Sequence, residues 1–174
     1  MEKTYKSDEI YHGKIINLLK DEVILDDGQH SYREVVEHRG GACIAIEDLD
    51  GKFIMVKQYR YAQKCEVLEF CAGKLEPEEK PDVTVIREAI EETGYDVELV
   101  HDFGYMMPTP GYVSERIYLY HGRVKAYLGQ TFDEDEKIEL YHYSLDEIEM
   151  MIKKGEIVDA KTICLVYHLR NIEQ

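Results

Sequence analysis

Three glutamates lie three and four residues apart near the middle of the chain, at Glu88, Glu91 and Glu92. On a helix this spacing puts three carboxylates on one face, where like charges repel by about a few tenths of a kcal/mol per pair. A hard divalent cation reverses that repulsion, because Mg²⁺ prefers a few carboxylates together with waters and phosphate oxygens. The cluster therefore predicts a metal site suited to phosphate chemistry, and the alternative is an ordinary solvated acidic face.

Residues around the cluster extend this prediction. Glu79 can join the three acids if the preceding loop folds back. Arg87 should point away from them by about one helical step, although it can still brace Glu91 four residues on. Gly73 permits a tight turn from strand to loop, and Gly94 permits a left-handed helix cap.

A helix is expected to carry these acids. Asp82 should cap it after Pro81, and Gly94 should stop it after Thr93. The residues expected on its core face are Val83, Val85, Ile86, Ala89 and Ile90.

The remaining elements are strands before the helix, and strands and helices after it. A turn at 26–28 and a hairpin turn at 48–51 separate the first strands. The expected strands are 15–25, 31–38, 42–47, 52–59, 66–72, 97–105, 116–124 and 138–143. Ser144 and Glu147 predict a capping box for a helix ending near Gly155, and Asp159 can open a last helix. This order favours an α/β sandwich with a mixed sheet over a doubly wound parallel sheet.

Length and charge narrow the class of protein. A chain of 174 residues favours one domain, and 44% hydrophobic residues suffice for one core. A net charge of −15 argues against partners that are nucleic acids or anionic membranes. No apolar run is long enough to span a membrane and no signal-peptide core follows Met1, so we expect a soluble, intracellular protein.

The four cysteines have neither CxxC nor zinc-finger spacing. Buried, reduced thiols are therefore expected, which suits the cytoplasm. They are Cys43, Cys65, Cys71 and Cys164.

The whole pattern, from Gly73 through Glu79 to the run Arg87-Glu88-Ala89-Ile90-Glu91-Glu92-Thr93-Gly94-Tyr95, resembles the Nudix box. That box is the loop-helix-loop signature of hydrolases that cut nucleoside diphosphates linked to another group. Its glycine, arginine and glutamate positions are all matched. Ala89 and Tyr95 depart from its aliphatic positions, which concern packing. The resemblance implies a Nudix-type α/β/α sandwich with a mixed β-sheet at 41–174, plus an N-terminal β segment at 1–40 that is part of the same unit.

Other stretches resemble the ADP-ribose pyrophosphatase branch of that superfamily. Pro110 lies fifteen residues beyond Tyr95, as that branch tends to have it, in a loop at 108–116 that also contains Gly111. The segments at 56–60, 69–76 and 159–162 are similar as well, and the likeness covers about 11–169.

The resemblance implies a role for individual residues. Glu88, Glu92 and the backbone carbonyl of Ala72 would bind Mg²⁺, or Mn²⁺, with Glu91 close by. Arg87 and Glu91 would complete the catalytic helix.

Substrate contacts are implied in the same way. Arg60 would bind the diphosphate or the terminal ribose. Glu115 would lie near that ribose, with Gly111 in the same binding loop, although Glu115 could be an ordinary loop acid. Arg33 could reach the substrate of a neighbouring subunit, because this branch forms homodimers through the N-terminal β segment.

The acidic run at 133–136 resembles the loop from which this branch supplies a base to the attacking water. Glu134 is favoured over Glu136 for that role. A plain solvated acidic loop is the competing interpretation.

The expected activity is Mg²⁺-dependent hydrolysis of ADP-ribose to AMP and ribose 5-phosphate. Three alternatives stay open. They are the same chemistry on a GDP- or UDP-sugar, a Nudix-like module that binds a nucleotide without cutting it, and a structural acidic domain without a ligand.

Overall fold

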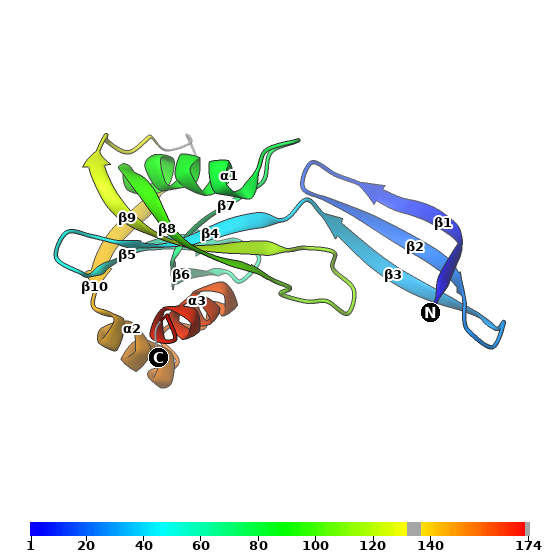
Figure 1. The fold of residues 1–174 in the computed structure, drawn as a ribbon. Coiled ribbons are helices and arrows are strands. Elements are labelled where there is room, and N and C mark those ends of the chain that lie inside the picture. The colour runs from blue at the N-terminus through cyan, green and yellow to red at the C-terminus, as the bar shows by residue number, and fades with distance from the viewer. Residues whose placement is uncertain (132–136, 173–174) are drawn as a thin grey trace. The chain divides into compact units, whose positions relative to one another are not determined.

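The structure, a computed structural model, describes residues 1–131 and 137–172 (Figure 1). The chain folds into two compact units. The first unit is Met1–Gly40 with Met107–Arg116, and the second is Gly41–Met106 with Ile117–Gln174. The expected boundary at 40/41 and the role of 1–40 in dimerisation stay predictions.

The first unit contains a three-stranded antiparallel sheet of β1 (Lys3–His12), β2 (Ile16–Ile24) and β3 (His30–His38). Gly28, at φ 81°, allows the tight turn between β2 and β3. β1 was not predicted, because every one of its residues is exposed and its sequence lacks an apolar alternation.

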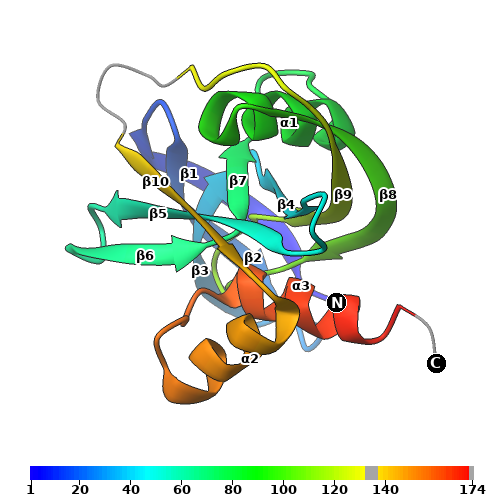
Figure 2. The same ribbon diagram turned by 90° about the vertical axis from the view of Figure 1, so that its left-hand side faces the viewer.

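The second unit is a mixed seven-stranded sheet between helices (Figure 2). Its strands are β4 (Gly41–Glu47), β5 (Phe53–Arg60), β6 (Cys65–Glu69), β7 (Cys71–Lys74), β8 (Tyr95–Met106), β9 (Ile117–Tyr127) and β10 (Ile138–Tyr143). The main order is β10-β5-β4-β9-β8, in which β4 and β9 are parallel. Helix α1 (Pro81–Glu88) covers one face, and α2 (Leu145–Lys154) and α3 (Ala160–Arg170) cover the other. The predicted α/β/α sandwich with a mixed sheet is confirmed.

The strand expected at 66–72 is two strands instead. β6 pairs with β5, and β7 pairs with β4, so the chain changes partner at Phe70. The backbone N–H of Phe70 leaves the ladder and donates to Thr162 Oγ1 at 2.9 Å. This change of partner brings β7 beneath α1, where the acidic residues lie.

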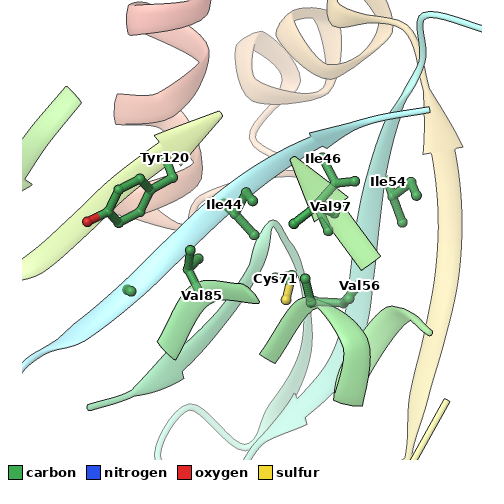
Figure 3. Close-up of a cluster of buried hydrophobic side chains, with 10 residues drawn as sticks. Ile44, Ile46, Ile54, Val56, Cys71, Val85, Val97 and Tyr120 are labelled. Atoms are coloured by element: carbon green, nitrogen blue, oxygen red, sulfur yellow. The ribbon is translucent and has the colours of Figure 1, made fainter. Parts of the chain in front are cut away.

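A hydrophobic cluster holds α1 on the sheet (Figure 3). Val85 and Ala89 of the helical segment are fully buried against Ile44 of β4 and Val56 of β5. Val83 is 52% exposed, so its assignment to the core face was wrong. Burying the apolar face at about 25 cal/mol per Å² fixes the orientation of the opposite, acidic face.

Two further local predictions can be checked directly. The capping box at Ser144 and Glu147 is present, and Gly155 ends α2 at φ 74°. All four cysteines are free, but Cys65 is exposed and Cys164 is only half-buried, so the expectation that every thiol is buried was wrong for these two. In the described part of the chain, no helix is both long and apolar enough to cross a membrane.

Candidate active site

The acidic helix is α1, continued by a π-helical turn, η1 (Ala89–Thr93). Pro81 occupies the first turn and Lys80 is the N-cap residue, without a side-chain cap. Asp82 is therefore not the cap that was predicted, but it lies in the first turn, where its charge suits the helix dipole. Gly94, at φ 77°, ends the segment as predicted. Single π-helical turns often occur at functional sites, and this one carries Glu91 and Glu92.

Gly73 of β7 lies directly under the carboxylate of Glu88. A Cβ atom at Gly73 would come within 1.8 Å of Glu88 Cδ and 1.9 Å of Oε1. A side chain at this position would displace the Glu88 carboxylate, so glycine leaves free the space that the carboxylate occupies. The close approach of strand and helix forms one wall of the site.

Arg87 lies at the centre of the acidic cluster rather than pointing away from it. Its Nη1 donates to Glu88 Oε1 and Glu91 Oε2, both at 2.8 Å. Its Nε and Nη2 donate to the two carboxylate oxygens of Glu79, each at 3.0 Å. The prediction that Arg87 points away was wrong, because its long side chain lies along the acidic face instead.

Glu79 folds back onto the helix, as expected. Besides Arg87, its Oε2 accepts hydrogen bonds from Thr84 Oγ1 at 2.8 Å and from the backbone N–H of Glu76 at 3.1 Å. The Arg87 guanidinium, with these donors, holds the pKa of Glu79 down at about 2. Glu79 is thus a fixed anion that orients Arg87.

Glu92 is 5% exposed and points into the protein, unlike Glu91, whose side chain is 44% exposed. Its Oε2 accepts a hydrogen bond from the N–H of Ala72 at 3.3 Å, and its Oε1 accepts one from Gln58 Nε2 at 3.4 Å. Burial raises the pKa of Glu92 to about 7, and the charge of Glu88 acts in the same direction. The thiol of Cys71 opposes the rise by donating to the carboxylate.

These residues fit a divalent cation. Within residues 1–131 and 137–172, no group of three His, Cys, Asp or Glu side chains converges on a metal position, and the guanidinium of Arg87 takes up oxygens of Glu79, Glu88 and Glu91. A positive charge next to a buried carboxylate with a raised pKa and a second carboxylate nevertheless stabilises the ionised form of both. The atoms that would bind the ion are oxygens, and Mg²⁺ and Mn²⁺ prefer oxygen ligands.

Arg60 ends β5 in the second unit, and its Nε donates to Glu69 Oε1 at 2.7 Å. Its positive charge lowers the pKa of Glu92, in opposition to the dominant effect of burial. The structure therefore brings Arg60 electrostatically close to the acidic cluster.

The other predicted substrate contacts belong to the first unit. Arg33 of β3 pairs with Glu2 and donates from Nη1 to the carbonyl of Tyr32 at 2.7 Å. Glu115 lies with an oxygen 3.3 Å from His38 Nδ1, and Gly111 is in the same segment of that unit. The predicted bases, Glu134 and Glu136, lie outside the described residues.

Three contacts of the acidic segment were not predicted from sequence. Gln58 and Cys71 contact the carboxylate of Glu92, and Gln130 Nε2 donates to its backbone carbonyl at 2.8 Å. The signal in the sequence for Gln58 was that it is a polar residue near the end of a predicted strand. Nothing local in the sequence marks Gln130, which is 38 residues from its partner.

The chain is similar in sequence to several known proteins. A model of the NUDIX domain matches residues 37–166. The chain is 39% identical over 171 residues to the methanol dehydrogenase activator of Bacillus methanolicus, a match that covers 97% of this chain and 92% of that protein. It is 33% identical, with the same coverage, to the ADP-ribose pyrophosphatase of Bacillus subtilis (strain 168).

Another relative and a solved structure are also similar to this chain. The GDP-mannose pyrophosphatase of Salmonella typhimurium is 36% identical over 149 residues, which is 79% of this chain and 77% of that protein. A crystal structure of an ADP compounds hydrolase superposes with a TM-score of 0.84 at 16% identity, over 98% of this chain and 92% of the other. By its matching domain, its curated relatives and its fold, the chain belongs to the NUDIX domain family.

Proposed function

We propose that the protein hydrolyses the diphosphate bond of ADP-ribose, giving AMP and ribose 5-phosphate, with Mg²⁺ as cofactor. The observation that carries this proposal is the buried Glu92, with a pKa of about 7, beside Glu88 on a helix over glycine. A cation next to this pair would stabilise the ionised form of both carboxylates and could receive a diphosphate. The similarity to an ADP-ribose pyrophosphatase supports the choice of substrate.

Glu88, Glu92 and the backbone carbonyl of Ala72 would hold the ion, with Glu91 close by. When bound, a divalent ion would neutralise the diphosphate and stabilise charge as it moves onto the leaving phosphate. Mn²⁺ has the same preference for oxygen and could replace Mg²⁺. Arg87 keeps three carboxylates at fixed positions through its four hydrogen bonds to them.

The remaining steps belong to the substrate contacts and to a base. Arg60 would bind the diphosphate, or the terminal ribose, through the guanidinium. A carboxylate of the acidic loop, with Glu134 favoured over Glu136, would take a proton from the attacking water. The water oxygen forms a bond to one phosphorus as the bridging P–O bond breaks, and the proton goes to the base.

A GDP- or UDP-sugar is the alternative substrate. The 36% identity to a GDP-mannose pyrophosphatase over 79% of the chain supports this alternative substrate. The diphosphate chemistry is the same in both cases, so the choice depends on contacts to the base and the sugar.

We also propose that the protein is a cytoplasmic homodimer. The first unit exposes large apolar side chains on β1 and β3, including Tyr5, Ile10 and Tyr32, and exposed apolar groups on a small sheet favour association. Arg33 would then reach the substrate of the partner, and Glu115 and Gly111 would line the ribose end. Light scattering tests the dimer, and mixing Arg33→Ala subunits with Glu92→Gln subunits tests sharing of the site. Recovery of activity in the mixture would support sharing, and its absence would oppose it.

A substrate panel tests the proposed activity. ADP-ribose, GDP-mannose and UDP-glucose would each be incubated with Mg²⁺, with Mn²⁺ and with a chelator, and the products would be identified. We expect AMP and ribose 5-phosphate from ADP-ribose only when the ion is present. In H₂¹⁸O, the product that carries the label identifies the phosphorus attacked. Turnover in chelator, or none with any of the three compounds, would contradict the proposal.

A further inference from the structure

Glu69 is a buried acid that the proposed chemistry does not use. It ends β6 and is only 1% exposed. Its Oε1 accepts the 2.7 Å hydrogen bond from Arg60 Nε, and its Oε2 accepts a hydrogen bond from Lys161 Nζ. One carboxylate therefore connects a cation at the edge of the active site to a cation in the interior.

Lys161 is unusual in being a lysine that is only 8% exposed. Its Nζ also donates to Asp159 Oδ1 at 2.9 Å. Buried lysines are rare unless they are paired, and here both partners are carboxylates. Lys161 thus supplies the positive charge that a carboxylate as deeply buried as Glu69 requires.

The position of this network is fixed by the start of α3. Asp159 caps the helix by accepting hydrogen bonds from the N–H of Thr162 at 2.9 Å and from its Oγ1 at 2.7 Å. Thr162 Oγ1 also accepts a hydrogen bond from the backbone N–H of Phe70, the residue that follows Glu69. The buried end of the network therefore has little freedom to move.

The outer end of the network differs from the buried end. The side chain of Arg60 is 39% exposed. Nε is bound to Glu69, and the two terminal nitrogens, Nη1 and Nη2, make no hydrogen bond within residues 1–131 and 137–172. A guanidinium held through Nε presents this pair as a fork that matches two phosphate oxygens.

We propose that Glu69 is a positioning residue that fixes the guanidinium of Arg60 for the diphosphate, with Lys161 as its buried counter-charge. This inference rests on the proposed hydrolysis, because Arg60 must bind the substrate for its orientation to matter. Glu69 and Lys161 act through Arg60 and do not themselves touch the substrate. An arginine in solution would lose rotational freedom on binding phosphate, and here that freedom is already lost.

The first test is Glu69→Gln, which keeps the shape and removes the charge. We expect KM for ADP-ribose to rise about tenfold, the effect of losing one charge-assisted hydrogen bond, while kcat changes less. An unchanged KM overturns the proposal. Arg60→Lys, on a more exposed side chain, gives an answer even if Glu69→Gln fails to fold. It keeps the charge but loses the fork, so we expect a similar rise in KM, and an unchanged KM again overturns the proposal.

A double-mutant cycle tests whether the effect passes through Arg60. In an Arg60→Ala background, Glu69→Gln and Lys161→Met should each change KM by less than about twofold, because the group they position is absent. A full effect of either substitution in that background would overturn the proposal for that residue, and for Lys161 it would indicate direct contact with the substrate.

Glu47→Gln is the matched control. Glu47 also accepts a hydrogen bond from an arginine Nε, that of Arg123, at 2.8 Å, and no role in the site is assigned to it. Its replacement should leave KM and kcat unchanged, and an equal rise in KM would show that loss of any such pair has this effect and would overturn the proposal. Wild-type protein without turnover on any nucleoside diphosphate sugar refutes the proposed function itself. Turnover by wild type with normal KM in Glu69→Gln refutes only the positioning role.

Discussion

Replacing Glu92 by glutamine should stabilise the protein when no divalent ion is present. Burial raises the pKa of Glu92 from its ordinary value of 4.5 to about 7. The folded state therefore holds a proton more tightly than the unfolded chain does. Its stability is greatest below pH 4.5 and falls as the pH rises toward 7, where the buried carboxylate becomes charged.

The size of this penalty follows from the change in pKa. Each tenfold change in acidity corresponds to about 1.4 kcal/mol, so a rise from 4.5 to about 7 amounts to about 3 kcal/mol at pH 8. Glutamine is neutral and can still accept the N–H of Ala72. In a chelator at pH 8, Glu92→Gln should thus unfold at a temperature higher by up to about 10 °C.

Mg²⁺ should reverse the order of the two proteins. Wild type gains about 4 kcal/mol by binding the ion at one thousand times the dissociation constant, which exceeds the penalty of about 3 kcal/mol, and the variant gains much less. The variant should also lose turnover while it stays folded. Thermal unfolding at pH 4.5, 6 and 8, with Mg²⁺ and with chelator, measures each of these effects on stability.

Glu91→Gln is the control, because the side chain of Glu91 is 44% exposed and its replacement should not stabilise the protein. The reasoning is refuted if Glu92→Gln is less stable than wild type at pH 8 in chelator, or if the difference is the same at pH 4.5. An active, metal-dependent Glu92→Gln enzyme would refute the assignment of the metal site.

Three further substitutions test the surroundings of the site. Gly73→Ala places a Cβ within 1.8 Å of Glu88 Cδ, so the Glu88 side chain must shift and metal affinity should fall by about tenfold or more. Calorimetric titration of Mn²⁺ would detect this fall, and unchanged affinity would contradict the proposal that Glu88 binds the ion from its observed position. Arg87→Gln removes the guanidinium shared by three carboxylates and should lower the free energy of unfolding by about 1–3 kcal/mol in urea, with part of the loss restored by Mg²⁺. Equal losses with and without Mg²⁺ would contradict this picture of charge compensation. Ser144→Ala removes the capping box of α2 and should cost about 1 kcal/mol in urea while kcat/KM stays constant, and a change in kcat/KM would tie α2 to the site.

Features set by neighbouring residues were predictable from the sequence. The hairpin at Asp48, the capping box at Ser144 and the stop at Gly94 depend on residues only a few positions apart, and all three occur. The position of the acidic helix was predictable for the same reason, but its change to a π-helical turn at Ala89 and the exposure of Val83 were not.

Features set by distant contacts were not predictable in this way. A helical projection puts Glu88, Glu91 and Glu92 on one face, but it does not show that β7 passes beneath Glu92 and buries it. The partners Glu69 and Lys161 are 92 residues apart, so no local pattern connects them.

Strand β1 illustrates the opposite failure. All of its residues are exposed, so it lacks the alternation that identifies a half-buried strand. Its antiparallel pairing with β2 is seen only in the folded structure.

The most direct test of the account is a crystal structure with Mn²⁺ and a non-hydrolysable analogue of ADP-ribose, measured for anomalous scattering. The account predicts a manganese peak bonded to carboxylate oxygens of Glu88 and Glu92, with a phosphate oxygen of the analogue as a further ligand. A well-ordered analogue with no manganese at these two glutamates would contradict it.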